Sequence, residues 1–380
     1  MLKLLIPILF AAAAIRGDEP LCDPVSGFPT TEQPVRPGRI LSSKKQRTTQ
    51  QNEIFFSFDL LVWDAREEGL EYAYKNTGNQ TNQSLTSLEP HTKFEPAFRL
   101  GLGGFLPYDH WKLGALYTFY RTNRHTSGSQ SFSPTGTPGP GMSSVWTYPS
   151  AFSNNNNGAR FTSASNQWRL HASLLDFALS RPCSIASYFT ATPSFGIRSA
   201  WLHQRYEVNY GSGNLIVFGA GNQVNVISSG IEMNCSSNNV GLLFGCGFNW
   251  AMGKNWDLFT DLSGAFLASH FDVKRGETDL FQNLAGTLQT QSVRLKSEYW
   301  TFRPQGQLAL GFRYVNDFRY GSRLVRYRIS AAYEAQMWWK QNQLLRYIDT
   351  LNTLSSGANT TPTQGDLMFH GADLSAGFDF

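Results

Sequence analysis

Residues 240–250, VGLLFGCGFNW, decide the class of fold. Every even-numbered position from Val240 to Trp250 is apolar, whereas the odd-numbered positions hold glycine, leucine and asparagine. Successive side chains of a β-strand point to opposite faces, so this alternation predicts a strand with one apolar face. If the same residues were wound as a helix, they would scatter around its axis. The stretch is therefore expected to be one strand of a sheet.

The same alternation recurs in residues 300–314 and from Val325 onward. These runs are about eleven to fifteen residues long, beyond the usual five or six of globular strands but sufficient for a tilted membrane crossing. A soluble β-sandwich also alternates, but it has no need of such length. We therefore expect the apolar faces to contact lipid, with Phe244, Leu310 and Ile329 among the lipid-facing residues.

Ten such strands can be placed along the chain, near residues 54–64, 94–104, 111–121, 167–179, 187–207, 240–251, 256–271, 298–314, 323–338 and 367–380. The connections between them alternate in length. Those at 105–110, 180–186, 252–255 and 315–322 are short, and those at 65–93, 122–166, 208–239, 272–297 and 339–366 are long. Outer-membrane barrels have short periplasmic turns and long external loops. The sequence thus predicts an all-β fold over residues 53–380, a transmembrane antiparallel β-barrel of about ten to twelve strands.

The N-terminus has the three parts of a secretory signal peptide: a positive charge at Lys3, a short apolar run and the small pair Ala12 and Ala14. The apolar run is too short to cross a membrane as a helix. Residues 1–14 are therefore predicted to direct export, and residues 15–52, which contain five prolines and no periodicity, to form a flexible periplasmic leader. Together with the barrel they predict localisation to the bacterial outer membrane.

The composition agrees with this class. Aromatic residues reach 14% against 16% charged residues, which suits an apolar belt around a polar interior. The net charge of +4 is too small for a nucleic-acid footprint, so we expect outer-membrane lipid rather than nucleic acid as a partner.

Aromatic residues near the expected strand ends predict interfacial girdles, and one aromatic ends the chain. The girdle residues are expected to be Trp63, Trp111, Trp168, Trp250, Trp256, Trp300, Trp338 and Trp339. Phe380 closes an alternating final strand, which resembles the signal that such barrels present to the barrel-assembly machinery. We expect that machinery to be a second partner.

Residues with catalytic or metal-binding potential are scattered. The seven histidines form no HExxH motif and no His/Cys cluster with metal spacing, so we expect no metal, no cofactor and no enzymatic activity. The nearest catalytic candidate is His203 with Asp and Ser residues of the external loops, but the spacing selects no nucleophile. The four cysteines Cys22, Cys183, Cys235 and Cys246 permit disulfides in an exported chain and leave their connectivity open.

Strand parity predicts which charges face the lumen. The inward set comprises Arg99, Arg169, Arg198, Arg303, Arg313, Arg326 and Arg328, with Asp59, Asp257, Asp261, Glu334, Asp373 and Asp379 as the main opposing acids. Arg303, Arg313, Arg326 and Arg328 lie on two neighbouring strands and could form one basic wall that concentrates anions. Alternatively, the arginines pair with carboxylates across the lumen and brace the barrel, because an enclosed charge is costly unless paired.

Four segments resemble a known family: FDLLVWDA at 58–65 followed by GLEYA at 69–73, PSFGIRSAW at 193–201, LLFGCG at 242–247 and YEAQMWWKQN at 333–342. They are similar to the Legionella-type major outer membrane protein family, also found in environmental relatives of chlamydiae. The resemblance implies a pore-forming role in the outer membrane and identifies no solute.

The function expected from the sequence is a porin-like barrel for passive diffusion of small hydrophilic solutes or ions. The alternative is a structural or adhesive barrel whose external loops bind a partner. Ten strands would give a narrow bore, between the filled barrels of about eight strands and the open channels of about sixteen. A homo-oligomer is compatible with the sequence, which does not specify one.

Overall fold

The computed structural model describes residues 54–77, 84–106, 111–131, 141–147, 160–213, 215–217, 223–282, 285–320, 323–348 and 359–380. Ten long strands make up most of this part of the chain. They are β1 (Ile54–Glu67), β4 (Phe94–Phe105), β5 (Lys112–Ser129), β7 (Arg160–Ser180), β9 (Phe189–Gly213), β11 (Gln223–Ala251), β12 (Trp256–Gln282), β13 (Leu288–Tyr320), β14 (Arg323–Trp338) and β17 (Leu367–Asp379).

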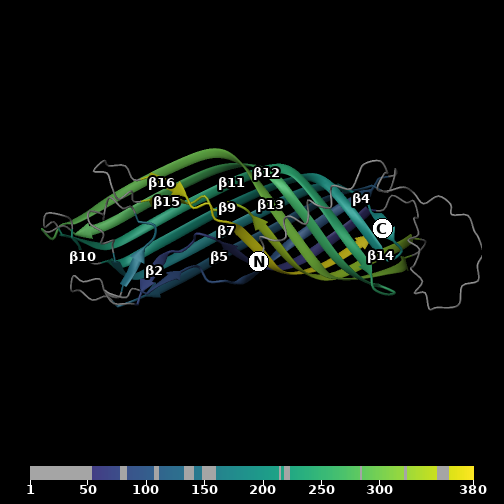
Figure 1. Ribbon diagram of the computed structural model, residues 1–380, viewed down its shortest axis with the longest axis horizontal. Coiled ribbons are helices and arrows are strands. Elements are labelled where there is room, and N and C mark those ends of the chain that lie inside the picture. Colours follow the sequence, from purple (N-terminus) through teal and green to yellow (C-terminus); the bar gives the residue numbers. More distant parts are fainter. Residues whose placement is uncertain are drawn as a thin grey trace, which may run out of the picture.

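The ten strands close into a barrel (Figure 1). Each pairs antiparallel with its neighbours in chain order, and β1 pairs with β4 on one side and with β17 on the other. The pairing of β1 with β17 closes the ring, so the long strands leave no open edge at membrane height. The predicted fold class is confirmed, and each of the ten predicted crossings coincides with one of these strands.

The two ends of the barrel differ. The short connections and the C-terminus lie at one end, where the backbone N–H of Phe380 donates to the carbonyl oxygen of Ile54 at 2.9 Å (Figure 1). The long connections lie at the other end, which places that end outside the cell.

The strands run further outward than the sequence predicted. Strand β11 has 29 residues and β13 has 33. Most of the segments predicted as long loops at 208–239 and 272–297 are strand instead. The predicted strands end where the alternation of apolar and polar residues ends. Beyond the membrane the outer face meets water and becomes polar, yet the backbone pairing continues.

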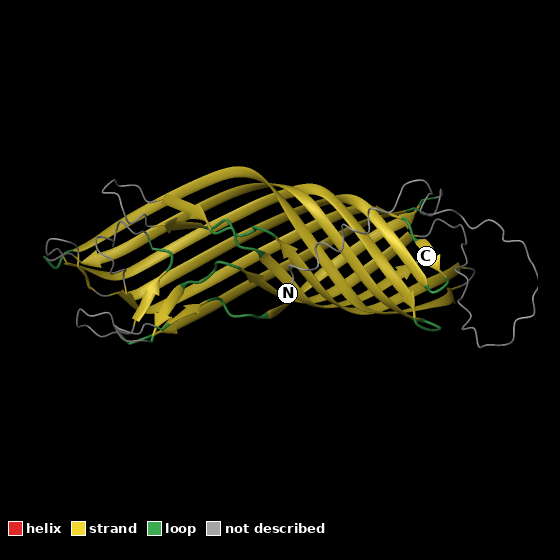
Figure 2. Cartoon of the chain, viewed as in Figure 1, coloured by secondary structure: helices red, strands yellow, loops and turns green. Residues whose placement is uncertain are grey.

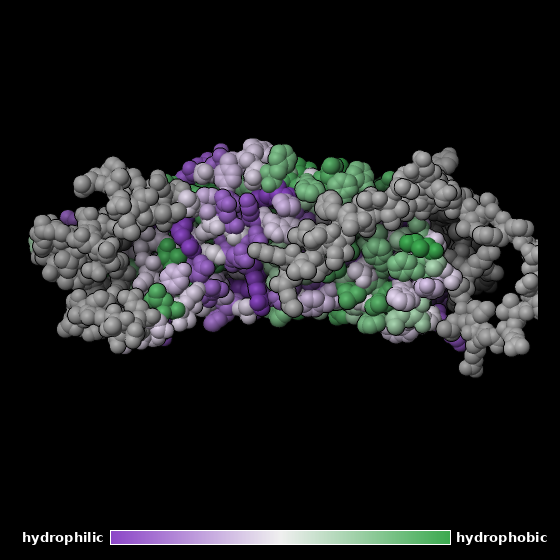
Figure 3. Space-filling model, in the orientation of Figure 1, coloured by the Kyte–Doolittle hydropathy of each residue, from purple (hydrophilic) through white to green (hydrophobic). Residues whose placement is uncertain are grey.

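An apolar belt surrounds the half of the barrel nearer the short turns (Figure 3). It consists of outward-facing side chains at alternate positions, such as Ile54 to Val62 on β1 and Trp300 to Tyr314 on β13. Phe244, Leu310 and Ile329 are 46%, 52% and 56% exposed on this face, as predicted. Above Trp300 the outer face of β13 turns polar at Glu298.

The tryptophans divide between the two faces. Trp250, Trp256 and Trp300 are exposed on the outer surface, where a girdle requires them. Three other tryptophans face the lumen and are at most 2% exposed: Trp63, Trp168 and Trp338. The prediction that they belong to the girdle is wrong. Each occupies a lumen-facing position in the alternation of its strand, and nearness to a strand end does not reveal the face.

Chain from three external connections folds into the external half of the lumen. We call residues 69–76, 141–147 and 341–348 the plug. It includes β2 (Ala73–Asn76), β6 (Gly141–Ser144) and β15 (Leu345–Ile348), and β2 and β6 pair with each other. Its side chains join a buried core with lumen-facing residues of the barrel wall. The remaining short strands are β3 (Leu85–Leu88), β8 (Cys183–Ala186), β10 (Leu215–Val217) and β16 (Asn359–Pro362).

In the described residues no helix is long and apolar enough to cross a membrane, and Figure 2 draws no helix there. The predicted signal peptide (1–14) and leader (15–52), with Cys22, lie outside the described residues. Cys235 is a free, buried cysteine, and Cys246 is a free cysteine on the outer face.

Candidate functional site

The lumen is the candidate site, and most of the predicted charges face it. Arg99, Arg198, Arg303 and Glu334 are 6%, 3%, 4% and 1% exposed, enclosed by the wall and by one another. Arg313, Arg326 and Arg328 share the lumen-facing alternation nearer the periplasmic end and are less enclosed.

Arg99 on β4 binds three carboxylates. Its guanidinium donates to both oxygens of Glu334 on β14, at 2.8 and 3.0 Å. Asp373 on β17 accepts at 3.4 Å, and Asp59 on β1 lies 3.7 Å away. Strands β4 and β14 are not neighbours, so this bidentate pair reaches over the two strands between them. Such a fork-to-fork contact is among the stronger and more directional ion pairs in proteins.

Arg198 on β9 makes a second set of contacts across the lumen. It donates to the two oxygens of Asp176 on β7 at 2.7 and 2.6 Å. The same guanidinium also donates to Gln305 and, at 3.2 Å, to Gln307, both on β13. Because β9 and β13 are separated by two strands, these bonds also span the lumen.

The contacts of Arg99 and those of Arg198 are joined, because Gln307 donates from its amide nitrogen to Glu334 at 2.8 Å. We call the connected set the lumen network: Asp59, Arg99, Asp176, Arg198, Gln305, Gln307, Glu334 and Asp373. It forms a charged layer at the height of the apolar belt.

The four arginines considered for one basic wall occupy different surroundings. Arg326 pairs with Asp317 at 2.8 Å, and Arg328 pairs with Asp379 at 2.6 Å.

Arg313 and Arg303 lie against aromatic rings. Arg313 donates to Asn249 at 3.0 Å and lies 4.2 Å over the Phe259 ring. Arg303 lies on the external side of the lumen network, 4.0 Å over the Phe271 ring. The structure therefore groups Arg99, Arg198 and Glu334 in the lumen network and gives the four arginines of the proposed wall separate partners.

Arg169 does not face the lumen. Its neighbours Trp168 and Leu170 are buried on the lumen side, and its own side chain is 40% exposed on the outer surface. The prediction that it points inward is wrong.

Asp176 is a member of the lumen network that the sequence analysis missed. It lies in the apolar run LLDFAL at 174–179. A lone carboxylate within an apolar membrane strand is itself a signal for a lumen-facing position, because the lipid face would not accept it.

The plug covers the external side of the lumen. Tyr206 donates from its hydroxyl to the carbonyl of Leu70 at 2.6 Å, and the Trp146 indole donates to the carbonyl of Glu71 at 2.7 Å. Arg275 on β12 donates to the carbonyl of Leu345 at 2.9 Å and also to that of Trp146. One buried guanidinium thereby holds two plug segments together.

Two carboxylates follow Arg275 on the same lumen-facing side of β12. Glu277 pairs with Arg275 at 2.7 Å. Burial and the neighbouring Glu277 raise the pKa of Asp279 to about 7, above its usual value of 3.8. This group lies well external to the apolar belt, four residues along β12 from Arg275.

A closed antiparallel barrel with an apolar belt and a charged lumen defines an outer-membrane β-barrel protein. The chain belongs to the family of the Legionella pneumophila major outer membrane protein precursor, whose model matches residues 47–380. This confirms the resemblance seen in the sequence and the outer-membrane localisation. No curated protein matches the chain.

Solved structures of outer-membrane barrels are similar to this chain at low identity. The outer membrane protease OmpT from Escherichia coli is 9% identical, with a TM-score of 0.34 over 89% of this chain and 99% of that one. A Pseudomonas aeruginosa FadL homologue is 11% identical, with a TM-score of 0.25 over 87% of this chain and 90% of that one. The Pseudomonas putida toluene transporter TodX is 10% identical, with a TM-score of 0.19 over 86% and 89%.

Proposed function

We propose that the protein is a narrow, gated passage through which small ions and hydrophilic solutes cross the outer membrane. The observation that carries this proposal is the lumen network, a set of charged and amide side chains at the height of the apolar belt. Paired charges lining a constriction favour small hydrated species over apolar ones and restrict the bore.

The plug accounts for the gating. Aromatic side chains and buried hydrogen bonds close the external half of the lumen, so passage requires the plug to move. We expect small, intermittent conductance and weak ion selectivity, because Arg326 and Arg328 each have a carboxylate partner.

Planar-bilayer recording of the full mature chain tests the proposal. The variant Trp146→Ala removes a fully buried plug side chain, and we expect open time to increase several-fold. Trp300→Ala is the matched control, because it removes an equally large side chain that is 70% exposed on the outer face. If neither the wild-type protein nor Trp146→Ala conducts while both remain folded, the passage is excluded.

The same packing gives a second candidate, a structural barrel whose external loops bind a partner. A filled external half would present a rigid outer surface and needs no conduction. Absence of current in the wild type and in Trp146→Ala, with both folded, would favour this function.

A further inference from the structure

One buried arginine of the lumen has no carboxylate partner among the described residues. Five arginines there are at most 6% exposed: Arg99, Arg124, Arg198, Arg275 and Arg303. The first four each lie 2.6–2.8 Å from a carboxylate oxygen. Arg303 is the exception, although an enclosed charge is costly unless it is paired.

The guanidinium of Arg303 has one edge that makes no hydrogen bond to the described protein. Its Nη1 donates to the side-chain oxygen of Gln341 in the plug at 2.9 Å. Its Nε and Nη2 are buried and have no partner among the described residues. Arg198 uses the same two nitrogens to bind both oxygens of Asp176. The unpartnered edge of Arg303 therefore has the shape and charge that bind a carboxylate.

Two acidic residues lie near Arg303 without pairing with it. Glu67 accepts a hydrogen bond from the amide of Gln204, and Asp366 accepts one from the backbone N–H of Lys340 at 2.8 Å. Their negative charge opposes an incoming anion, and more strongly if that anion carries two charges. The surroundings thus favour a singly charged carboxylate over phosphate.

Two further polar groups beside Arg303 are buried without a partner. Arg303 lies opposite Leu267 on β12, and its guanidinium lies 4.0 Å over the Phe271 ring. Ser269 lies between these two residues on the same face, opposite Asn239 on β11. The Oγ of Ser269 and the Oδ1 of Asn239 have no hydrogen-bond partner among the described residues. Buried polar groups normally have one, so their grouping here indicates a polar ligand.

The position of Arg303 places this ligand on the path through the lumen. Gln305, a member of the lumen network, is two residues further in on the same face of β13. On the external side, Gln341 of the plug also donates to Ser237 at 3.1 Å. The site therefore lies between the lumen network and the plug, where a solute in transit must pass.

We propose that Arg303 binds the carboxylate of a small, singly charged hydroxy acid in transit through the lumen. This inference rests on the passage proposed above and names the class of its solute. The Nε and Nη2 of Arg303 donate to the two carboxylate oxygens. The hydroxyl group of the solute donates to Asn239 and accepts from Ser269.

Isothermal titration calorimetry on the full mature chain in zwitterionic detergent tests the site. The probes are lactate, lactamide, which has a similar shape and no charge, and inorganic phosphate. We expect lactate to bind. Lactamide and phosphate should bind at least about tenfold more weakly, because lactamide lacks the charge-assisted pair and phosphate meets the nearby acids.

Arg303→Lys separates the geometry of the site from its charge. Lysine keeps the charge but cannot offer two parallel donors, so the Kd for lactate should rise by about tenfold. Arg313→Lys is the matched control, because Arg313 lies on the same strand and face, over the Phe259 ring, and already donates to Asn249. It should leave the Kd unchanged. The heat-dependent gel mobility of the barrel verifies that each variant is folded.

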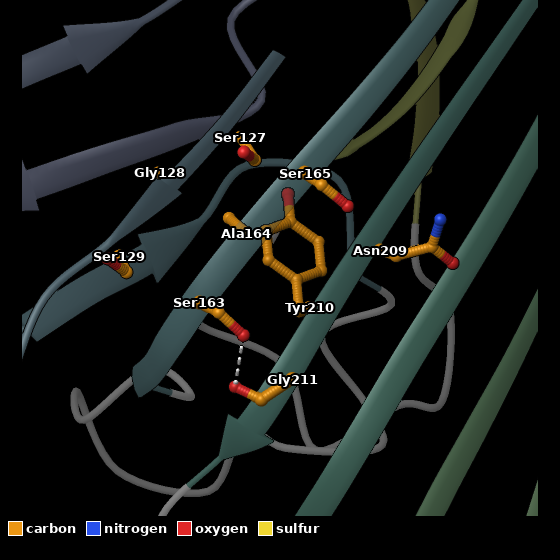
Figure 4. Close-up of a pocket in the computed structure, with 9 residues that line it drawn as sticks. All are labelled: Ser127, Gly128, Ser129, Ser163, Ala164, Ser165, Asn209, Tyr210 and Gly211. Atoms are coloured by element: carbon orange, nitrogen blue, oxygen red, sulfur yellow. Dashed lines mark hydrogen bonds between the residues drawn. The ribbon is translucent and has the colours of Figure 1, made fainter. Parts of the chain in front are cut away.

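Ser269→Ala tests the hydroxyl part of the site. It should weaken lactate several-fold and leave propionate, which has no hydroxyl group, unaffected. Ser165→Ala is the control. Ser165 lies with Ser163 and Asn209 in a cleft of about 370 Å³ on the outer wall (Figure 4). No residue that lines this cleft is charged, so the control should leave lactate binding unchanged.

Several outcomes would overturn the proposal. Equal binding of lactate and lactamide would remove the role of the carboxylate, as would wild-type affinity in Arg303→Lys. Tighter binding of phosphate than of lactate would assign Arg303 to inorganic anions. Bilayer currents recorded on the same samples separate the site from the passage. Current without lactate binding overturns the site alone, whereas lactate binding without current overturns the passage alone.

Discussion

At the residue scale, Arg99 is surrounded by more negative charge than it carries. Its three carboxylate neighbours are all buried, so its loss leaves them without a cation. We expect Arg99→Met to lower the free energy of unfolding by about 3–5 kcal/mol, the range for breaking a buried ion pair. Glu334→Gln should cost less, because Asp59 and Asp373 remain beside Arg99. Urea unfolding followed by gel mobility measures both, and equal losses would contradict this account.

Leu308 tests the apolar belt. It lies midway between Trp300 and Tyr314 on the outer face of β13 and is 40% exposed. Arginine at the bilayer midplane costs about 2–4 kcal/mol in such barrels, so Leu308→Arg should impair assembly and lower the unfolding free energy by that amount.

The matched control is Glu298→Arg, on the same strand and face but above the belt. It breaks only a surface ion pair, worth about 0–1 kcal/mol. If the control is as damaging as Leu308→Arg, the belt does not end near Trp300.

The alternation of side chains between the two faces of a strand explains what the sequence could predict about single residues. Where every second residue of a strand is apolar, as around Phe244, counting along the strand in steps of two shows which face each side chain occupies. In β7 the alternation is weak, because Ser165, Gln167 and Arg169 face water rather than lipid, and the facing of Arg169 could not be inferred. The partners of Arg99 and Arg198 depend on which strands meet across the lumen, which no local pattern contains.

At the element scale, Asp279 is a carboxylate that titrates near neutrality on the strand whose Arg275 anchors the plug. Burial and Glu277 raise the pKa of Asp279 from 3.8 to about 7. Arg275, which holds two plug segments, lies on the same face of β12, and we expect opening of the plug to hydrate Asp279 and to return its pKa toward 3.8. This contribution favours the packed plug at low pH and is lost progressively as pH rises from about 4 to about 7. The plug should therefore open more readily above about pH 7.

Hydrogen exchange of residues 141–147 and 341–348, corrected for intrinsic rates, measures that opening. Exchange should be faster at about pH 8 than at about pH 5.5 in the wild type, and Asp279→Asn should remove the difference. Asp272→Asn is the control, because Asp272 lies on the outer face of the same strand. A pH dependence that survives in Asp279→Asn would assign it to another group.

The number of long strands and their order could be predicted because connection lengths alternate. Their external ends could not, since β11 and β13 continue as strands after their outer faces become polar. The plug was equally inaccessible. In the sequence the plug residues are isolated apolar residues within polar connections: Tyr72, Trp146 and Leu344. They form one hydrophobic core only because the closed barrel wall surrounds them.

At the scale of the whole molecule, the orientation of the barrel has a direct test. Ala285 lies in the connection between β12 and β13, at the end of the barrel that carries the long connections. Lys254 lies in the short turn between β11 and β12, at the opposite end. A membrane-impermeant maleimide on intact cells should label Ala285→Cys and spare Lys254→Cys, whereas disrupted cells should show both. Labelling of Lys254→Cys on intact cells would invert the topology.

The pairing of β1 with β17 also governs how the chain can fold. It joins Phe55 to Asp379, nearly the greatest sequence separation available, so its contacts appear only after a large loss of loop-closure entropy. Until the last strand has been delivered, the first and the penultimate strands expose unpaired backbone, the form most prone to aggregation. Export of β17, the thirteen residues Leu367–Asp379, is therefore the committed step, and a chain cut before Leu367 should accumulate as aggregate rather than as a smaller barrel.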